Sequence, residues 1–151
     1  MTTPGQTRPI LVSACLLGRR CRYDGQDSYD AVLDASLESS EIIPVCPEEL
    51  AGLATPRPAA HFVAGDGHAV LDGAGRIETV ETGTDITDAF ISGANETLRI
   101  ARDSGAHRGI LKDGSPSCGV ARISVCGSKV RGRGVTAALL SRAGLHIEGR
   151  P

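Results

Sequence analysis

The stretch Ile10-Leu11-Val12-Ser13-Ala14-Cys15 is a short apolar run that ends at a cysteine, and it is typical of a buried strand. A second run, residues 42–45, leads directly into Cys46, and its proline predicts an edge position or a strand end. A third run, residues 109–112, is followed by a Gly/Ser/Pro turn and then by Cys118. Three predicted strands are therefore each followed closely by a cysteine.

Helical patterns alternate with these runs. The clearest covers residues 85–103, where an apolar stripe recurs every three or four positions and Gly105 stands at the expected end; the stripe is Ile86, Phe90, Ala94, Leu98 and Ala101. Residues 29–39 and 135–142 are predicted as shorter helices, and residues 145–147 as a further strand. Strands that alternate with helices predict an α/β fold, Rossmann-like, with a mostly parallel sheet and helices on both faces.

The middle of the sequence has weaker patterns. Residues 52–67 are rich in Pro and Gly and are expected to form an irregular loop. Residues 69–72 and 76–80 flank a Gly-Ala-Gly turn and predict a small hairpin inserted on the main sheet. We expect residues 1–9 to be a frayed N-terminus and residues 10–151 to form a single domain.

Length and charge restrict the classes of function. The chain has 151 residues, 40% of them hydrophobic, which is enough for one domain with a real core. Its net charge of −2 gives no electrostatic basis for binding nucleic acid or an acidic membrane. The longest apolar stretch, residues 10–17, is too short to cross a membrane and is not typical of a signal peptide. We therefore expect a cytoplasmic protein, either a monomer or a small homo-oligomer.

The cysteines are the main candidates for chemistry, because a reducing cytoplasm disfavours structural disulfides. In parallel sheets, ligands bind at the carboxyl ends of the strands, so Cys15, Cys46 and Cys118 are expected to meet at one edge. Several thiolates together select zinc or an iron–sulfur cluster. Cys21 is a rival ligand or a thiol beside the metal, whereas Cys126, among apolar residues, is interpreted as a small buried hydrophobe.

Polar residues near these cysteines are further candidates for a role in binding or catalysis. Glu48 follows Cys46-Pro47 and is either a general acid or base or the solvated first turn of a helix. The turn Ser115-Pro116-Ser117-Cys118-Gly119 offers two hydroxyls, and its glycine lets a small ligand approach the backbone. The four histidines share no ligand-like spacing and are interpreted as surface or loop residues.

Short sequence motifs occur along the chain at residues 12–18, 21–25, 44–48, 55–58, 83–87, 110–112, 115–119 and 134–137. Together these motifs resemble those of the bacterial thiouracil desulfidase family. The resemblance runs in the family's own order from about residue 10 to residue 147. Each motif is short, but their conjunction is highly specific.

The resemblance implies a [4Fe-4S] cluster bound by Cys15, Cys46 and Cys118, with one iron that has no protein ligand. It also implies a small thiocarbonyl substrate, such as a thiolated pyrimidine, which a non-redox reaction converts to the oxo compound and hydrogen sulfide. Glu48 would then be the acid or base, and Ser117 would position the ring or its leaving sulfur, with Ser115 also binding substrate. The stretch after Gly119 is shorter than in the family, and residues 120–130 are expected to form a wall of the pocket.

Two other classes of protein also accommodate these cysteines. One is a zinc-binding structural or regulatory module that uses Cys15, Cys21, Cys46 and Cys118 and has no turnover. The other is a sulfur carrier in which Cys15 and Cys118 cycle through a persulfide.

Overall fold

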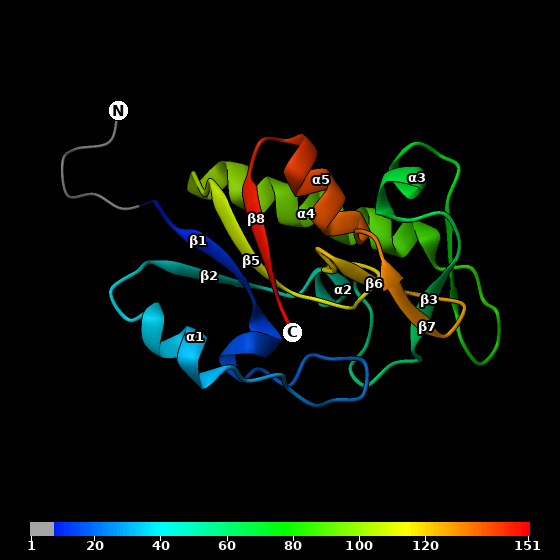
Figure 1. Cartoon of the computed structure of the whole chain (residues 1–151), viewed down its shortest axis with the longest axis horizontal. Helices are drawn as coiled ribbons and strands as arrows, with labels where there is room; N and C mark the ends of the chain where they lie inside the picture. The colour runs from blue at the N-terminus through cyan, green and yellow to red at the C-terminus, as the bar shows by residue number, and fades with distance from the viewer. Residues whose placement is uncertain (1–7) are drawn as a thin grey trace.

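Residues 8–151 are described by the computed structural model, in which two four-stranded sheets lie side by side (Figure 1). The first, sheet A, has the order β2-β1-β5-β8 and is parallel throughout. Its strands are β1 (Ile10–Ser13), β2 (Ile42–Val45), β5 (Arg108–Lys112) and β8 (His146–Arg150). The three apolar runs of the sequence are thus neighbours in one sheet, with the proline-containing strand β2 at its edge as predicted.

Helices cover both faces of sheet A. On one face, η1 (Ala14–Leu17) and α1 (Ala31–Ser36) pack against Ile10, Val12 and Ile110. On the other face, α4 (Thr87–Ser104) and α5 (Val135–Arg142) pack against Leu11 and Leu111. Both faces of each central strand are therefore buried, which explains why these strands are continuous apolar runs.

The long helix matches its predicted stripe except at Ile86, which precedes the first helical residue and is only partly buried. Phe90, Ala94, Leu98 and Ala101 of α4 are buried, and Gly105 ends the helix in the left-handed conformation.

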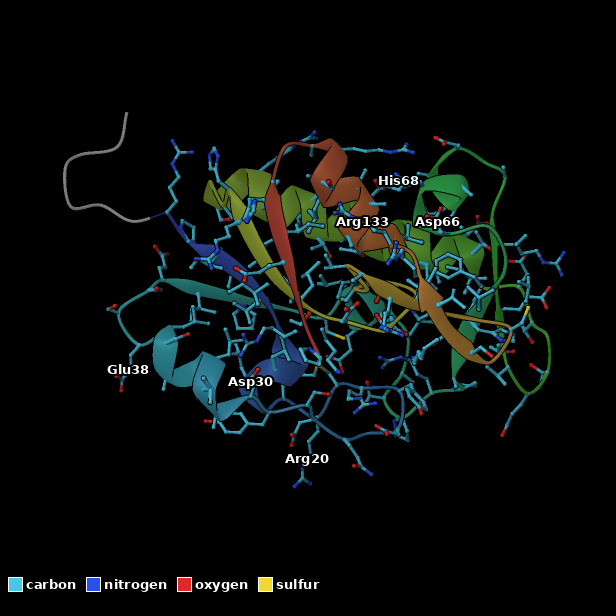
Figure 2. All side chains as sticks on the ribbon, in the orientation of Figure 1. Arg20, Asp30, Glu38, Asp66, His68 and Arg133 are labelled. Carbon is cyan, nitrogen blue, oxygen red and sulfur yellow. The ribbon has the colours of Figure 1, made fainter. Side chains whose placement is uncertain are left out.

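The short helix α1 packs against the core through one side only. Leu33 and Leu37 point into the core, whereas Val32 is 76% exposed. Asp30, labelled in Figure 2, caps the helix by accepting a hydrogen bond from the Leu33 amide. Its carboxylate also pairs with Arg150 of β8 at 3.0 Å. This link to the end of β8, together with the packing of Leu33 and Leu37, fixes which side of α1 faces the sheet.

The second sheet, sheet B, differs from the predicted hairpin. Its order is β4-β3-β6-β7, with strands β3 (Ala60–Ala64), β4 (Arg76–Thr79), β6 (Arg122–Val125) and β7 (Ser128–Arg131). β4 pairs antiparallel with β3, which lies inside the stretch predicted as an irregular loop. The expected strand at residues 69–72 is wrong, because residues 67–71 form α3 (Gly67–Leu71), capped by Asp66, whose side chain accepts from the Ala69 amide.

The structure describes only the end of the predicted N-terminal segment. Of the predicted frayed segment, residues 1–7 lie outside the described residues, and Pro9 is already buried. Within residues 8–151, none of the helices combines the length and apolarity that crossing a membrane requires.

Candidate metal centre

A cavity of about 460 Å³ lies at the carboxyl edge of sheet A, where this edge faces sheet B. Its walls on the sheet A side come from the ends of β1, β2 and β5 and from the loops that follow them. Its opposite wall includes His61 of β3, Ser124 of β6 and Lys129 of β7. The cavity is therefore placed where parallel α/β sheets bind ligands.

Four cysteines line this cavity, and all of them are free thiols. Cys15 lies in η1 just after β1, Cys46 directly follows β2, and Cys118 lies in the loop after β5. Cys21 comes from the loop after η1. Cys15, Cys21 and Cys118 are at most 8% exposed, and Cys46 is partly buried. The expected meeting of three strand-end cysteines is thus observed, with Cys21 beside them.

Hydrogen bonds connect three of these thiols and shift their pKa values. The Cys21 thiol donates to the Cys15 sulfur, which lowers the pKa of Cys15 and raises that of Cys21 to about 11. The thiol of Cys46 donates to Cys21, and this bond together with burial raises the pKa of Cys46 well above its ordinary value. Burial raises the pKa of Cys118 to about 12. Without a cation, Cys21, Cys46 and Cys118 therefore favour the neutral thiol, whereas a bound cation would favour their thiolates.

The loop that carries Cys118 is fixed by Asp113 at its start. One carboxylate oxygen of Asp113 accepts hydrogen bonds from four backbone amides at 2.9–3.2 Å, those of Gly114, Val120, Ala121 and Arg122. Burial raises the pKa of Asp113, but these four donors together outweigh burial and bring the pKa below its ordinary value. Inside the loop, Ser115 Oγ accepts from the Cys118 amide at 2.8 Å. Cys118 is therefore presented by a rigid loop.

The first turn of α5 holds the same loop from the other side. The amides of Thr136 and Ala137 donate to the Ser117 carbonyl at 2.9 and 3.2 Å. Gly134 makes this contact possible, because a Cβ there would lie 2.5 Å from the backbone of Ser117. The glycines before the last helix thus allow close packing against the cysteine loop.

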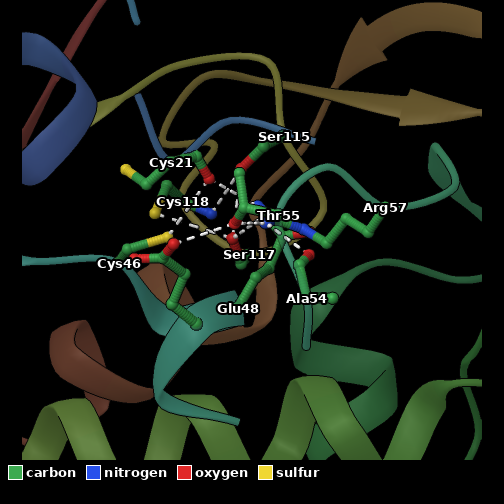
Figure 3. Close-up of polar contacts among 10 residues, drawn as sticks. Cys21, Cys46, Glu48, Ala54, Thr55, Arg57, Ser115, Ser117 and Cys118 are labelled. Atoms are coloured by element: carbon green, nitrogen blue, oxygen red, sulfur yellow. Dashed lines mark hydrogen bonds and ion pairs between the residues drawn. The ribbon is translucent and has the colours of Figure 1, made fainter. Parts of the chain in front are cut away.

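Cys46 and Glu48 are positioned by the short helix α2 (Pro47–Leu50). This helix packs against α4 at Gly93, where a Cβ would lie 2.1 Å from the Pro47 carbonyl oxygen. Glu48 points toward the cysteine loop and lies between two partners (Figure 3). Its Oε2 accepts a long hydrogen bond of 3.4 Å from Ser117 Oγ, and its Oε1 pairs with Arg57 Nε at 3.2 Å.

Arg57 is a site residue that the sequence did not single out. Its side chain is only 5% exposed, and it donates to the Cys21 carbonyl at 2.8 Å as well as to Glu48. It thus links the Cys21 loop to α2. Its position within Thr55-Pro56-Arg57-Pro58 gave no periodic signal, because the segment has no regular secondary structure.

Three further sequence predictions can now be compared with the site. Residues 120–130 do form a wall of the cavity, because Ser124 and Lys129 of the β6–β7 hairpin line it. His61 is not a surface residue, since it lines the cavity and its Nδ1 is buried. Cys126 is not a buried hydrophobe but an exposed residue in the β6–β7 turn, with a φ of 47°.

The donor set of the cavity fits an iron–sulfur cluster. Cysteine thiolates are the usual protein ligands of [4Fe-4S] clusters, and here three come from three neighbouring strand ends. Ser117 Oγ lies 3.6 Å from Cys118 Sγ, so a hydroxyl and a carboxylate stand directly beside the thiols. The arrangement can hold a thiophilic metal centre next to groups that move protons.

Comparisons with known proteins agree with this site. Residues 10–149 match the model of the 2-thiouracil desulfurase family. YbbK of Bacillus subtilis (strain 168), an uncharacterized protein, is 40% identical over an alignment of 141 residues. The match covers 91% of this chain and 93% of YbbK. The solved structure of TudS, a [4Fe-4S]-dependent thiouracil desulfidase, is 38% identical with a TM-score of 0.82, and the match covers 95% of this chain and 91% of TudS. The family resemblance predicted from the motifs is confirmed, and this chain belongs to the 2-thiouracil desulfurase family.

Proposed function

We propose that this protein binds a [4Fe-4S] cluster through Cys15, Cys46 and Cys118 and removes sulfur from a thiolated pyrimidine. The observation that carries the proposal is the convergence of these three thiols, from three adjacent strand ends, on one cavity that also holds Glu48. Membership of the family and the likeness to TudS support it. The cavity volume of about 460 Å³ is within the usual range for a small-molecule site.

With three protein thiolates as ligands, the cluster would keep one iron without a protein ligand, a Lewis-acidic and thiophilic position for the sulfur of a C=S group. The net reaction adds water to the thiocarbonyl carbon and releases hydrogen sulfide, so the carbon–sulfur bond is replaced by a carbon–oxygen bond. No electrons are gained or lost overall. The protein therefore has to supply proton transfer and orientation rather than a redox partner.

Glu48 is the group placed to move the protons. Its carboxylate takes a proton from the attacking water and returns it to the departing sulfur. Arg57, bonded to one carboxylate oxygen, keeps the other oxygen directed toward Ser117. This gives Glu48 a fixed orientation at the cavity surface, as general acid–base catalysis requires.

Ser117 and Ser115 are the proposed substrate-binding hydroxyls. Ser117 Oγ lies between the Glu48 carboxylate and the Cys118 sulfur, at 3.4 and 3.6 Å. Ser115 Oγ is 3.3 Å from Ser117 Oγ and accepts from the Cys118 amide, which leaves its proton available to donate. The two hydroxyls together would orient the ring or its leaving sulfur.

A pair of cysteine variants tests the ligand assignment. Cys118→Ser removes a buried thiol of the cavity, whereas Cys126→Ser changes an exposed thiol in the β6–β7 turn. After anaerobic reconstitution, we expect Cys118→Ser to lose the iron and the broad visible absorbance, and Cys126→Ser to bind iron like the natural chain. A full iron content in Cys118→Ser would refute the proposed ligand set.

A second variant tests the role of Glu48 separately. Glu48→Gln keeps the size of the side chain and one acceptor oxygen but replaces the basic carboxylate by a neutral amide. We expect an unchanged iron and sulfide content and a loss of 2-thiouracil turnover of about 10²-fold or more. Normal turnover in this variant would remove Glu48 from the reaction.

The same preparations separate the proposal from its two rivals. A zinc module would contain zinc and no labile sulfide after reconstitution, and it would leave 2-thiouracil unchanged. A persulfide carrier would release thiocyanate on treatment with cyanide and would do so without iron. An iron–sulfur desulfidase releases hydrogen sulfide from 2-thiouracil only when the cluster is present.

A further inference from the structure

Beside the cavity lies a second set of metal-ligating groups, which overlaps the proposed cluster ligands at one residue. One sulfur each from Cys21 and Cys46 and one carboxylate oxygen of Glu49 lie within 4.8 Å of one another. Cys21 is 2% exposed, and Glu49 is partly buried. Only Cys46 is shared with the three proposed cluster ligands.

We propose that Cys21, Cys46 and Glu49 form a binding site for a single Zn²⁺ ion. Thiolate and carboxylate groups are both zinc ligands, and zinc in proteins is usually tetrahedral. Sulfurs at about 2.3 Å from a tetrahedral zinc are separated by about 3.8 Å, so groups already within 4.8 Å need only small side-chain adjustments. Zinc is favoured over Fe²⁺ because a site with such ligands generally binds it more tightly.

The groups behind these ligands hold them in place. Thr55 Oγ1 donates to Glu49 Oε2 at 2.8 Å, and Arg57 donates to the Cys21 carbonyl at 2.8 Å. The other oxygen of Glu49, Oε1, is buried and accepts no hydrogen bond. It faces the guanidinium of Arg19 at 3.0 Å, but that side chain is 63% exposed and can move aside. Hydrogen bonds of this kind orient metal ligands in known sites.

The local charges also suit a divalent cation. Two thiolates and one carboxylate carry three negative charges, which Zn²⁺ reduces to one. Arg57 and Arg19 supply positive charge next to Cys21 and Glu49, respectively. The fourth position of a tetrahedral zinc would face the cavity, where a water molecule can fill it.

This site has a consequence for loading of the proposed cluster. Because Cys46 cannot serve both sets, zinc and the cluster exclude each other. Zinc bound at Cys21, Cys46 and Glu49 would therefore keep the chain in an inactive, cluster-free form. This consequence rests on the proposed function, whereas the zinc site itself does not.

The site is tested by titrating the metal-free chain with Co²⁺ under anaerobic conditions, followed by displacement with Zn²⁺. We expect one Co²⁺ per chain, with sulfur-to-cobalt charge-transfer absorbance for two thiolates. Cys21→Ser should abolish that absorbance, and Glu49→Gln should weaken Zn²⁺ binding by at least about tenfold. The matched controls Cys15→Ser and Cys118→Ser should bind Co²⁺ like the natural chain. Far-ultraviolet circular dichroism of each variant shows that it is folded.

The same variants should behave in the opposite way toward iron. Reconstitution should load iron into Cys21→Ser and Glu49→Gln but not into Cys15→Ser or Cys118→Ser. Loss of Co²⁺ binding in Cys15→Ser or Cys118→Ser, or the absence of Co²⁺ binding in the natural chain, would overturn the proposed zinc site.

A competition experiment tests the exclusion. Zn²⁺ added before reconstitution should lower iron uptake by the natural chain and should leave uptake by Cys21→Ser unaffected. If the natural chain takes up iron equally well with and without Zn²⁺, the exclusion is wrong. Zinc binding without any iron uptake would instead refute the proposed function and leave the zinc site standing.

Discussion

Sheet A and sheet B contribute different things to the cavity. Sheet A is parallel and covered by helices on both faces, and the ends of its strands bring Cys15, Cys46 and Cys118 together. Sheet B mixes parallel and antiparallel pairs, and its strand β7 is exposed along its whole length. Sheet B brings polar side chains such as Ser124 and Lys129. Sheet A thus supplies the thiols, and sheet B shapes the space in front of them.

Arg57 lies in the segment between α2 and β3, where the two regions join, and its replacement should have the largest effect on stability. In Arg57→Met, Glu48 loses its buried charge partner, and a change of this kind costs about 3–5 kcal/mol. We expect the free energy of unfolding of the metal-free chain, measured in urea, to fall by about 3 kcal/mol. Arg57→Lys should recover part of this loss, and a change below about 1 kcal/mol in Arg57→Met would contradict the joining role.

The contact between α4 and α2, the helix that follows β2 of sheet A, should give the second-largest effect on stability. A Cβ at Gly93 would lie 2.1 Å from the Pro47 carbonyl oxygen, so Gly93→Ala should push α2 away and cost about 1–3 kcal/mol. The neighbouring exposed position gives a matched control, because Ser92→Ala should be neutral or slightly stabilising. Thermal unfolding of both variants measures the difference, and a stabilised Gly93→Ala would show that the helices can separate freely.

Asp113 gives a smaller effect that depends on pH. Its pKa in the folded chain is below the ordinary value of 3.8, so its charge stabilises the fold above that pH, and this stabilisation is lost as the pH falls through the lowered pKa. Asp113→Asn keeps an acceptor oxygen but no charge, and we expect a loss of about 1 kcal/mol at neutral pH. The difference in melting temperature between the natural chain and the variant should shrink below about pH 4. A constant difference from pH 7 to pH 3 would be inconsistent with a charged Asp113.

The smallest expected effect on the metal centre comes from sheet B. Lys129 donates to Gly114 O and Ser124 Oγ at 2.7 and 2.6 Å and is exposed on its other side. In Lys129→Met, we expect the iron content to be unchanged and the unfolding free energy to shift by no more than about 0.5 kcal/mol. The KM for 2-thiouracil should rise severalfold while the cluster spectrum stays the same. Loss of iron in this variant would mean that the division of roles between the sheets is wrong.

The two sheets also differ in how well the sequence predicts them. β1, β2 and β5 are apolar because they are buried on both faces, and α4 shows a full stripe because one side faces the core. β7 has four exposed residues and depends on its pairing with β6, so it has no hydrophobic signal of its own. In the sequence, α3 resembles a strand because its Val70 and Leu71 are apolar. The segment is a helix in the structure, and the side chain of Asp66 caps its first turn.

The residues of the candidate site also differ in how well the sequence predicts them. The meeting of Cys15, Cys46 and Cys118 could be predicted because each follows a recognisable strand of a parallel sheet. The roles of Arg57 and Asp113 could not be predicted, because they depend on backbone carbonyls and amides that only the folded chain brings near. The closeness of Glu49 to Cys21 likewise results from the path of a loop without regular structure.

The most direct test of the central claim is an anaerobic iron and sulfide count on the reconstituted chain, with a visible spectrum before and after the addition of 2-thiouracil. The claim predicts about four irons and a matching amount of labile sulfide per chain, a broad brown absorbance, and conversion of 2-thiouracil to uracil with release of hydrogen sulfide. A chain that holds no iron after reconstitution, or one that holds the cluster and leaves 2-thiouracil and its nucleoside forms unchanged, would contradict it.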